Sequence, residues 1–179
     1  MNHNPSDLIA LFNQTFLDVY NTELVLGGDE PIYLPADDEY PHHRVIFARG
    51  YFASALHEIS HWCIAGAERR LLEDYGYWYE PDGRSEFKQA EFEKVEVKPQ
   101  AIEWILAKSC GFRFQVSCDN LNGDCEPDRV GFTNTVREQV LAYLEYGMPA
   151  RAKILSDVLR GSYQIAPLQP SDFPALERV

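Results

Sequence analysis

The residues best suited to chemistry lie in the segment 57–61, which reads His-Glu-Ile-Ser-His. If this segment is helical, His57 and His61 lie one turn apart on one face, with Cβ atoms about 6 Å apart. Two imidazoles at that spacing can bind one ion at roughly 2.0–2.2 Å per bond. The alternative is a pair of ordinary histidines on a half-buried helix, because short motifs also occur by chance. Two of the chain's five histidines flank Glu58 here, so we favour a metal site.

A third ligand has to come from another segment of the chain. Glu96 lies next to Pro99, and a proline kink can re-aim a nearby side chain into a cleft. We therefore prefer Glu96 as the third ligand. Other histidines and glutamates stay open as alternatives: His3, His42, His43, Glu91, Glu93 and Glu103.

Two chemistries share a ligand set of two histidines and one carboxylate. With zinc, the bound water is acidified and Glu58 acts as general base, which gives a peptidase. With Fe(II), the open coordination positions bind dioxygen and substrate, which gives an oxygenase. The ligand types do not choose between the two.

Two other segments carry polar or aromatic side chains that could line a cleft. The loop from Asp119 to Asp124 resembles the start of a calcium-binding loop, but Val130 stands where the twelfth-position glutamate is needed. We interpret this loop as a cleft wall or a plain turn. The aromatic run around Trp78 could stack on the stem of a cationic side chain or pack as satellite core.

The elements that position these residues are expected to be mainly helical. Hydrophobic spacing and turn residues predict helices from Ser6 onward and over 51–65, 68–74, 86–110, 134–146 and 149–160. Short strands are expected over 22–26, 31–34, 44–47 and 112–116. Pro99 should either kink the 86–110 helix near Glu96 or start a new helix.

These elements predict an α+β fold with a small sheet in the N-terminal third, packed on the helix that carries the histidines. The length of 179 residues predicts one domain over 1–179, with a tail at 166–179. The apolar stripe of the metal helix is expected to be buried: Phe52, Leu56, Ile59 and Cys63.

Composition narrows the possible partners and surroundings. The formal net charge of −12 argues against direct binding of nucleic acid and favours a partner that is cationic where it docks. We expect no membrane span and no signal peptide, and therefore a cytoplasmic protein. The four cysteines form no Cys-x-x-Cys pattern, so we expect reduced thiols and no structural zinc site.

The sequence resembles the bacterial elongation factor P hydroxylase family. The resemblance begins in the run 57–66 and continues in blocks that share the family's order and span about 8–163: 33–37 (YLPAD), 76–79 (GYWY), 81–84 (PDGR), 95–101 (VEVKPQA) and 118–121 (CDNL). Together these blocks are far more specific than the histidine motif alone.

The resemblance implies an iron-dependent hydroxylase that acts on the lysine of elongation factor P already carrying a β-lysyl group. It implies His57, His61 and Glu96 as ligands of Fe(II), with dioxygen as co-substrate. A long amine-bearing side chain would enter an acidic cleft favourably. Glu58 could then orient a ligand or accept a substrate ammonium instead of acting as a base.

Several roles stay open beside this interpretation. Asp119, Asp124 and Trp78 are our candidates for substrate binding. Families with this ligand set often use 2-oxoglutarate, and an arginine could bind its carboxylates: Arg44, Arg113 or Arg129. The rivals from other classes are a small zinc metallopeptidase and a non-catalytic binding module. The latter predicts that His57→Ala leaves partner affinity unchanged.

Overall fold

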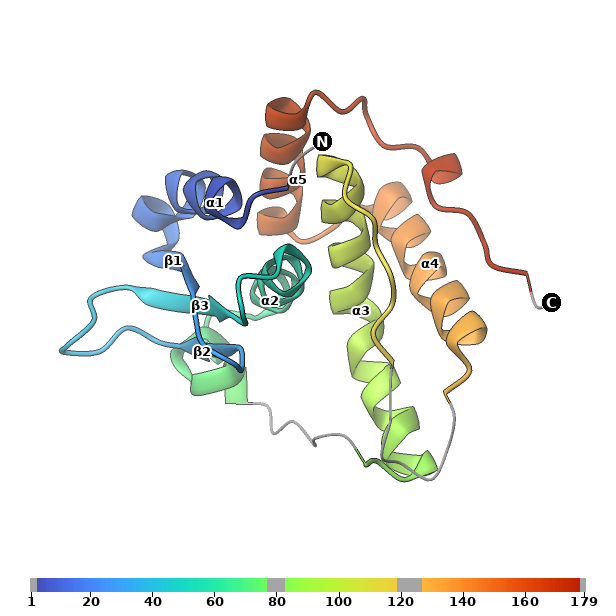
Figure 1. Ribbon diagram of the computed structural model, residues 1–179, viewed down its shortest axis with the longest axis horizontal. Coiled ribbons are helices and arrows are strands. Elements are labelled where there is room, and N and C mark those ends of the chain that lie inside the picture. The colour runs from blue at the N-terminus through green and yellow to red at the C-terminus, as the bar shows by residue number, and fades with distance from the viewer. Residues whose placement is uncertain (1–2, 77–82, 119–126, 178–179) are drawn as a thin grey trace.

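The computed structural model describes residues 3–76, 83–118 and 127–177. Its helices and strands follow one another as α1 Pro5–Tyr20, β1 Thr22–Leu26, β2 Ile32–Leu34, β3 His43–Phe47, α2 Phe52–Ile64, α3 Glu86–Cys110, α4 Arg129–Tyr146 and α5 Ala150–Tyr163 (Figure 1). Short 3-10 helices lie at Arg69–Leu71 (η1), Glu73–Gly76 (η2) and Pro170–Asp172 (η3). This is the expected α+β, mainly helical architecture with a small N-terminal sheet. Within the described residues, no helix has both the length and the apolar character needed to cross a membrane.

The first helix begins earlier than the sequence analysis expected. The side chain of Asn4 caps α1 by accepting a hydrogen bond from the backbone N–H of Ser6, so Ser6 lies inside the helix. Leu8, Phe12 and Phe16 recur every four residues on its buried face. This spacing directs one apolar stripe of α1 into the core.

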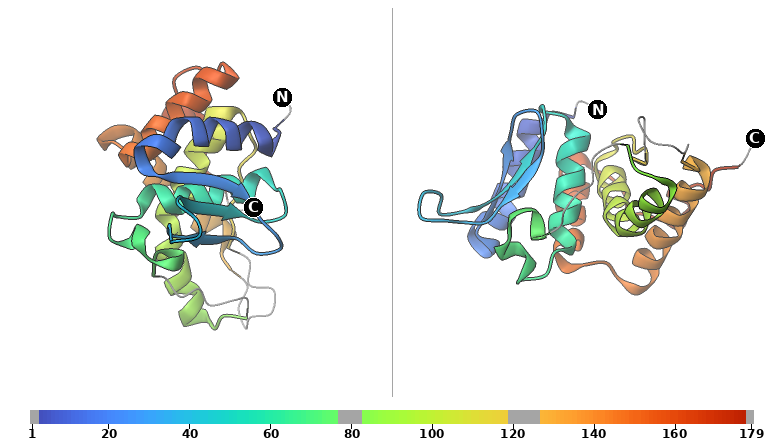
Figure 2. Two further views of the ribbon diagram at one scale, coloured as in Figure 1. Left: turned by 90° about the vertical axis from the view of Figure 1, so that its left-hand side faces the viewer. Right: turned by 90° about the horizontal axis from the view of Figure 1, so that it is seen from below.

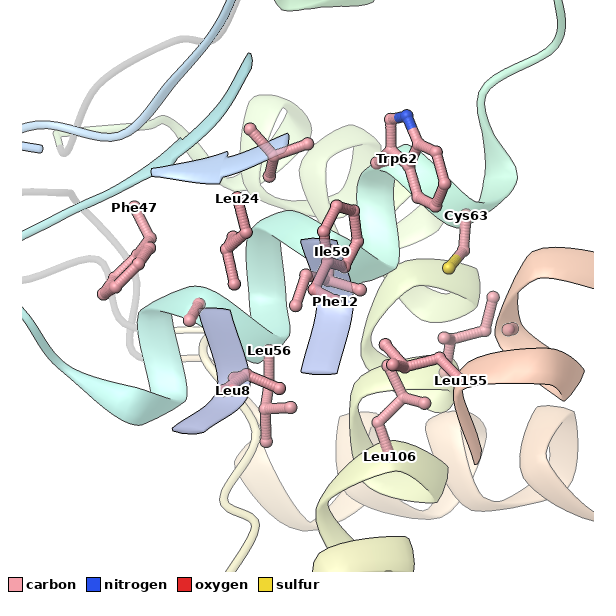
Figure 3. Close-up of a cluster of buried hydrophobic side chains, with 14 of the residues drawn as sticks. Leu8, Phe12, Leu24, Phe47, Leu56, Ile59, Trp62, Cys63, Leu106 and Leu155 are labelled. Atoms are coloured by element: carbon pink, nitrogen blue, oxygen red, sulfur yellow. The ribbon is translucent and has the colours of Figure 1, made fainter. Parts of the chain in front are cut away.

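The three strands form one small mixed sheet. β3 lies in the centre, with β1 parallel on one side and β2 antiparallel on the other. Leu24 of β1 and Phe47 of β3 are fully buried beside α1 and α2 (Figure 3). The sheet therefore supports the helix that carries the candidate metal ligands.

Helix α2 lies between the sheet and α3 (Figure 2, right). The apolar stripe expected on it is buried in the shared core: Phe52, Leu56, Ile59 and Cys63. Figure 3 shows the last three of these side chains. Because that stripe packs on the sheet and α1, the neighbouring face of α2, which bears His57 and His61, is free to meet α3.

Helix α3 is one continuous helix of 25 residues with Pro99 inside it, so no new helix begins at the proline. Its second half is almost completely buried between two apolar clusters. Ile102 and Leu106 pack toward α2 and α5, whereas Trp104 and Ile105 pack toward α4. This packing outweighs the roughly 3 kcal/mol that an internal proline costs a helix.

The prediction of a strand over 112–116 is wrong, because none of the described strands includes this segment or pairs with it. Its position is instead fixed by side chains of α3. The ring of Phe114 stacks on Trp104, with centroids 5.0 Å apart. The amide of Gln100 accepts a hydrogen bond from the backbone N–H of Ser117 at 2.9 Å and donates one to its carbonyl at 2.7 Å. A side-chain amide thus replaces the missing strand partner.

The remaining differences concern the ends of helices. α4 begins at Arg129, where the side chain of Asp128 caps it by accepting from Gly131 N–H, and not at Asn134. α5 continues beyond Gly161 to Tyr163. The expected helix over 68–74 is the pair of short 3-10 helices η1 and η2.

Arg151 of α5 closes the carboxyl end of α2. Its Nη2 atom lies 2.8 Å from the carbonyl oxygen of Trp62 and 3.1 Å from that of Cys63. Its guanidinium carbon lies 4.7 Å from the centre of the Trp62 ring.

Arg151→Met should lower the free energy of unfolding by about 2–3 kcal/mol, because buried carbonyls lose a charged donor. Urea denaturation measures this loss. Lys153→Met, at an exposed position of α5, is the control, and equal midpoints for the two variants would contradict the assignment.

Candidate metal centre

Three side chains from two helices meet at the interface of α2 and α3. One ligand atom each of His57, His61 and Glu96 lies within 4.8 Å of the other two. The two Nε2 atoms are 3.1 Å apart, and the carboxylate oxygens of Glu96 lie 3.3 Å from Nε2 of His61 and 3.7 Å from Nε2 of His57. Ligand atoms about 2.1 Å from one ion are themselves roughly 3.0–3.4 Å apart at octahedral or tetrahedral angles. The observed spacings are close to those of a shared ion.

The environment of Glu96 also fits a bound cation. Its side chain is only 1% exposed, and its Oε1 atom has no hydrogen-bond partner. A buried carboxylate oxygen without a partner costs free energy, so such atoms usually have one. An ion between Glu96 and the two imidazoles would supply the missing interaction.

Glu103 sets the orientation of His57. Its Oε2 atom lies 2.8 Å from Nδ1 of His57, and its side chain is buried. A carboxylate in this position holds the proton on Nδ1 and leaves the lone pair of Nε2 for a metal. Gln100, on the same face of α3, donates a hydrogen bond of 3.2 Å to Oε2 of Glu96. Glu103, one of the alternative third ligands, therefore contacts the candidate ligand His57 and is not itself part of the cluster.

The charges at the site shift the pKa values of two candidate ligands in the metal-free protein. Burial lowers the pKa of His57, but the hydrogen bond to Glu103 and the charges of Glu103, Glu96 and Glu58 outweigh it and raise this pKa from 6.5 to about 10. Burial raises the pKa of Glu96, yet the neighbouring His61, the charge of His57 and the hydrogen bond from Gln100 outweigh burial and lower this pKa from 4.5 to about 2. At neutral pH the metal-free site thus contains a protonated His57 and an ionised Glu96.

Metal binding should therefore release a proton. The stabilising charge on His57 is fully present below pH 6.5 and is lost as pH rises through about 10. A metal has to displace that proton, so affinity for a divalent ion should rise roughly tenfold per pH unit within this window. Calorimetry at pH 7.5 in two buffers of different ionisation enthalpy measures the number of protons released. Identical heats in the two buffers would contradict this expectation.

The candidate catalytic residue and the candidate substrate-binding residues are not part of the three-residue cluster. Glu58 lies beside His57 on α2 and is half-buried. Burial raises the pKa of Glu58, while the charges of the two histidines oppose that shift. Asp119, Asp124 and Trp78 lie outside the described residues.

The three other histidines considered as ligands lie elsewhere. The ring of His3 is 2.8 Å from the carbonyl oxygen of Cys110 and packs against aromatic rings of the core. The ring of His42 is 2.6 Å from the side-chain oxygen of Asn21, and His43 accepts a hydrogen bond from a backbone amide of the neighbouring loop. None of these three is part of the ligand cluster.

A pocket of about 960 Å³ reaches the candidate centre from outside. It runs along the N-terminal half of α3 as far as Pro99, opposite the segment that follows α2, and His61 and Glu96 belong to its lining. Among the lining residues that the structure describes, five are basic and three are acidic, and the acidic cleft candidates Asp119 and Asp124 lie outside the described residues. None of the three arginines considered for 2-oxoglutarate belongs to this lining: Arg44, Arg113 and Arg129.

The fold and the site define a class: a mainly helical protein with a candidate mononuclear metal centre of the two-histidine, one-carboxylate type. Residues 11–173 match the protein family described as "Elongation factor P hydroxylase". A relative from Haemophilus influenzae named "Elongation factor P lysine hydroxylase" is 60% identical over 163 residues, which cover 91% of each chain. The chain belongs to the elongation factor P hydroxylase family.

The sequence analysis missed the partnership between Glu103 and His57. A signal was available, because Glu96, Gln100 and Glu103 follow one another at spacings of four and three residues on one helix. Such residues share a helix face. Once Glu96 is chosen as ligand, the next two polar side chains of that face are expected to adjoin the site.

Proposed function

We propose that this protein hydroxylates the β-lysylated lysine of elongation factor P in the cytoplasm, with an iron ion held by His57, His61 and Glu96. Family membership supports the reaction type and the protein substrate. The observation that carries the site assignment is the convergence of three ligand atoms beside a pocket open to the outside. When bound to such a ligand set, iron supplies the activation of dioxygen at its open positions.

The residues of the chain have separable roles in this proposal. Glu103 keeps the proton on Nδ1 of His57, so that Nε2 faces the ion. Gln100 holds one oxygen of Glu96, which directs the other oxygen toward His61. Glu96 and His61 are buried, so water can reach these side chains only in small part.

A zinc metallopeptidase remains the rival that the same ligand set could support. It requires Glu58 as general base toward a bound water. The family match does not favour this rival. Zinc in the purified protein together with peptide cleavage that needs no oxygen would support the peptidase.

Glu58→Gln separates the two roles considered for Glu58. If Glu58 only neighbours the ligands, this variant should bind iron normally and hydroxylate at a rate within about threefold of the wild type, because amide and carboxyl groups have similar volumes. If Glu58 accepts or transfers a proton, the rate should fall roughly 10²–10⁴-fold at unchanged iron content. Single-turnover hydroxylation with a parallel iron assay measures both quantities.

Mass spectrometry of elongation factor P from cells with and without the gene tests the proposed function. Hydroxylation adds one oxygen atom, so the deletion strain should lack that mass increment on the modified lysine. Wild-type protein should restore the increment, and His61→Ala should not. If elongation factor P from the deletion strain had the same mass as that from the wild-type strain, the proposal would be wrong.

A further inference from the structure

Basic side chains gather on the described wall of one pocket in an acidic chain. The sequence has 28 acidic and 16 basic residues, yet among the described residues that line the pocket reaching His61 and Glu96, five are basic and three are acidic. Four of the five basic residues are exposed to solvent: Arg69, Lys88, Lys94 and Lys98. A basic mouth of this kind attracts a partner surface that carries carboxylates.

Exposed apolar side chains lie in the same two segments. Phe87 is 75% and Val95 57% exposed on the N-terminal half of α3, and Leu71 is 66% and Leu72 51% exposed after α2. Val95 lines the pocket and Phe87 adjoins the lining residue Lys88, whereas Leu71 and Leu72 follow the lining residue Arg69 by two and three positions. The remaining large exposed apolar side chains of the described residues are spread over other elements. In Figure 1 the N-terminal half of α3 extends below α2.

The length of the pocket indicates how a protein substrate would approach. Lys88 and Glu96 are both lining residues, and eight residues of helix span about 12 Å. A side chain that enters at Lys88 has to be long to reach the candidate ligands. The substrate backbone that carries this side chain stays at the mouth of the pocket. There the substrate residues next to the target lysine touch the basic and apolar side chains of the enzyme.

We propose that the rim formed by Leu71, Leu72, Phe87, Lys88, Lys94, Val95 and Lys98 is the docking surface for the protein substrate. The occupant is a protein surface with carboxylates and apolar side chains around its target lysine. This inference rests on the proposed function, which supplies a protein substrate for the pocket. The apolar residues provide buried area, and the lysines guide the encounter and fix its orientation.

Two rim variants and two matched controls test the docking surface. Lys94 is exposed and pairs with Glu91 within α3, just as Lys153 is exposed and pairs with Asp157 within α5. Phe87 lies near the start of α3, and Tyr146, 81% exposed, ends α4. Lys94→Glu and Phe87→Ser should each weaken binding of β-lysylated elongation factor P about tenfold, whereas Lys153→Glu and Tyr146→Ser should stay within about twofold.

Calorimetric titration of iron-loaded enzyme at low and high salt gives these affinities, and steady-state kinetics should show a raised KM at unchanged kcat. Wild-type affinity should fall with salt, and that of Lys94→Glu should fall less. Equal affinities of the rim and control variants, beside an active wild type, would overturn the docking surface alone. A change only in self-association would assign the rim to a second copy and also overturn it. If the wild type neither binds nor modifies the factor, the proposed function itself fails.

Discussion

Glu96→Gln should lower hydroxylation of elongation factor P by roughly 10³-fold or more, because groups that act as a unit lose nearly all function together. The carboxylate of Glu96 supplies the negative charge of the proposed ligand set and lies 3.3 Å from Nε2 of His61. Glutamine keeps the volume of the side chain but lacks that charge. The variant should therefore bind Fe(II) too weakly to be loaded, which atomic absorption after gel filtration measures.

The fold of Glu96→Gln is checked separately from its metal. Adding a divalent ion should raise the melting temperature of the wild type, because a ligand that binds the native state stabilises it. The melting temperature of the variant should not respond to the ion. Glu93→Gln is a matched control one turn earlier on α3, where the carboxylate accepts a hydrogen bond from Gln89. If Glu96→Gln were loaded with iron and active like Glu93→Gln, the proposed ligand set would be wrong.

The position of the two histidines could be predicted because local spacing determines it. The apolar residues of α2 recur at helical intervals, so the helix has to turn Phe52, Leu56 and Ile59 into the core. Burial of this apolar face fixes the direction in which His57 and His61 point, so no knowledge of distant segments is needed to predict it. Glu96 was preferred as the third ligand for a different reason, namely its position next to Pro99, where a kink could re-aim the side chain into a cleft. In the structure α3 is one helix that contains Pro99.

The features that sequence reasoning missed depend on contacts between distant segments. The segment 112–116 has the composition of a strand, but Gln100 and Trp104 of α3 provide its hydrogen bonds and packing. A single sequence does not reveal which helix covers such a segment. The start of α4 was placed late for a different reason, because the capping aspartate at position 128 follows Pro127 in a polar run without an apolar period.

Composition also did not predict which charged residues line the described part of the cleft. A net charge of −12 describes the whole chain, whereas the lining residues that the structure describes come from the segments 61–69 and 84–99. The lysines of α3 and Arg69 after α2 meet there because α2 and α3 pack against each other. The local balance of charge is therefore a property of the fold.

The second large effect is expected at Glu103, which does not belong to the proposed ligand set. Its carboxylate oxygen Oε2 lies 2.8 Å from Nδ1 of His57 and accepts a hydrogen bond from it, so Glu103 acts as a positioning residue. Removal of a carboxylate that orients a metal-binding histidine typically lowers metal affinity roughly 10–100-fold. Glu103→Leu should show a loss of this size, with hydroxylation restored in part by excess Fe(II).

Glu103→Gln is the conservative variant that separates orientation from bulk packing. Its amide oxygen can still accept the proton of Nδ1, so its metal affinity should remain within about fivefold of the wild type. Its loss of negative charge should lower the pKa of His57, since the hydrogen bond and charge of Glu103 raise that pKa in the metal-free protein. Proton release on metal binding should then fall near pH 7.5. A merely structural role for Glu103 would change the melting temperature of both variants and leave their metal affinity and proton release as in the wild type.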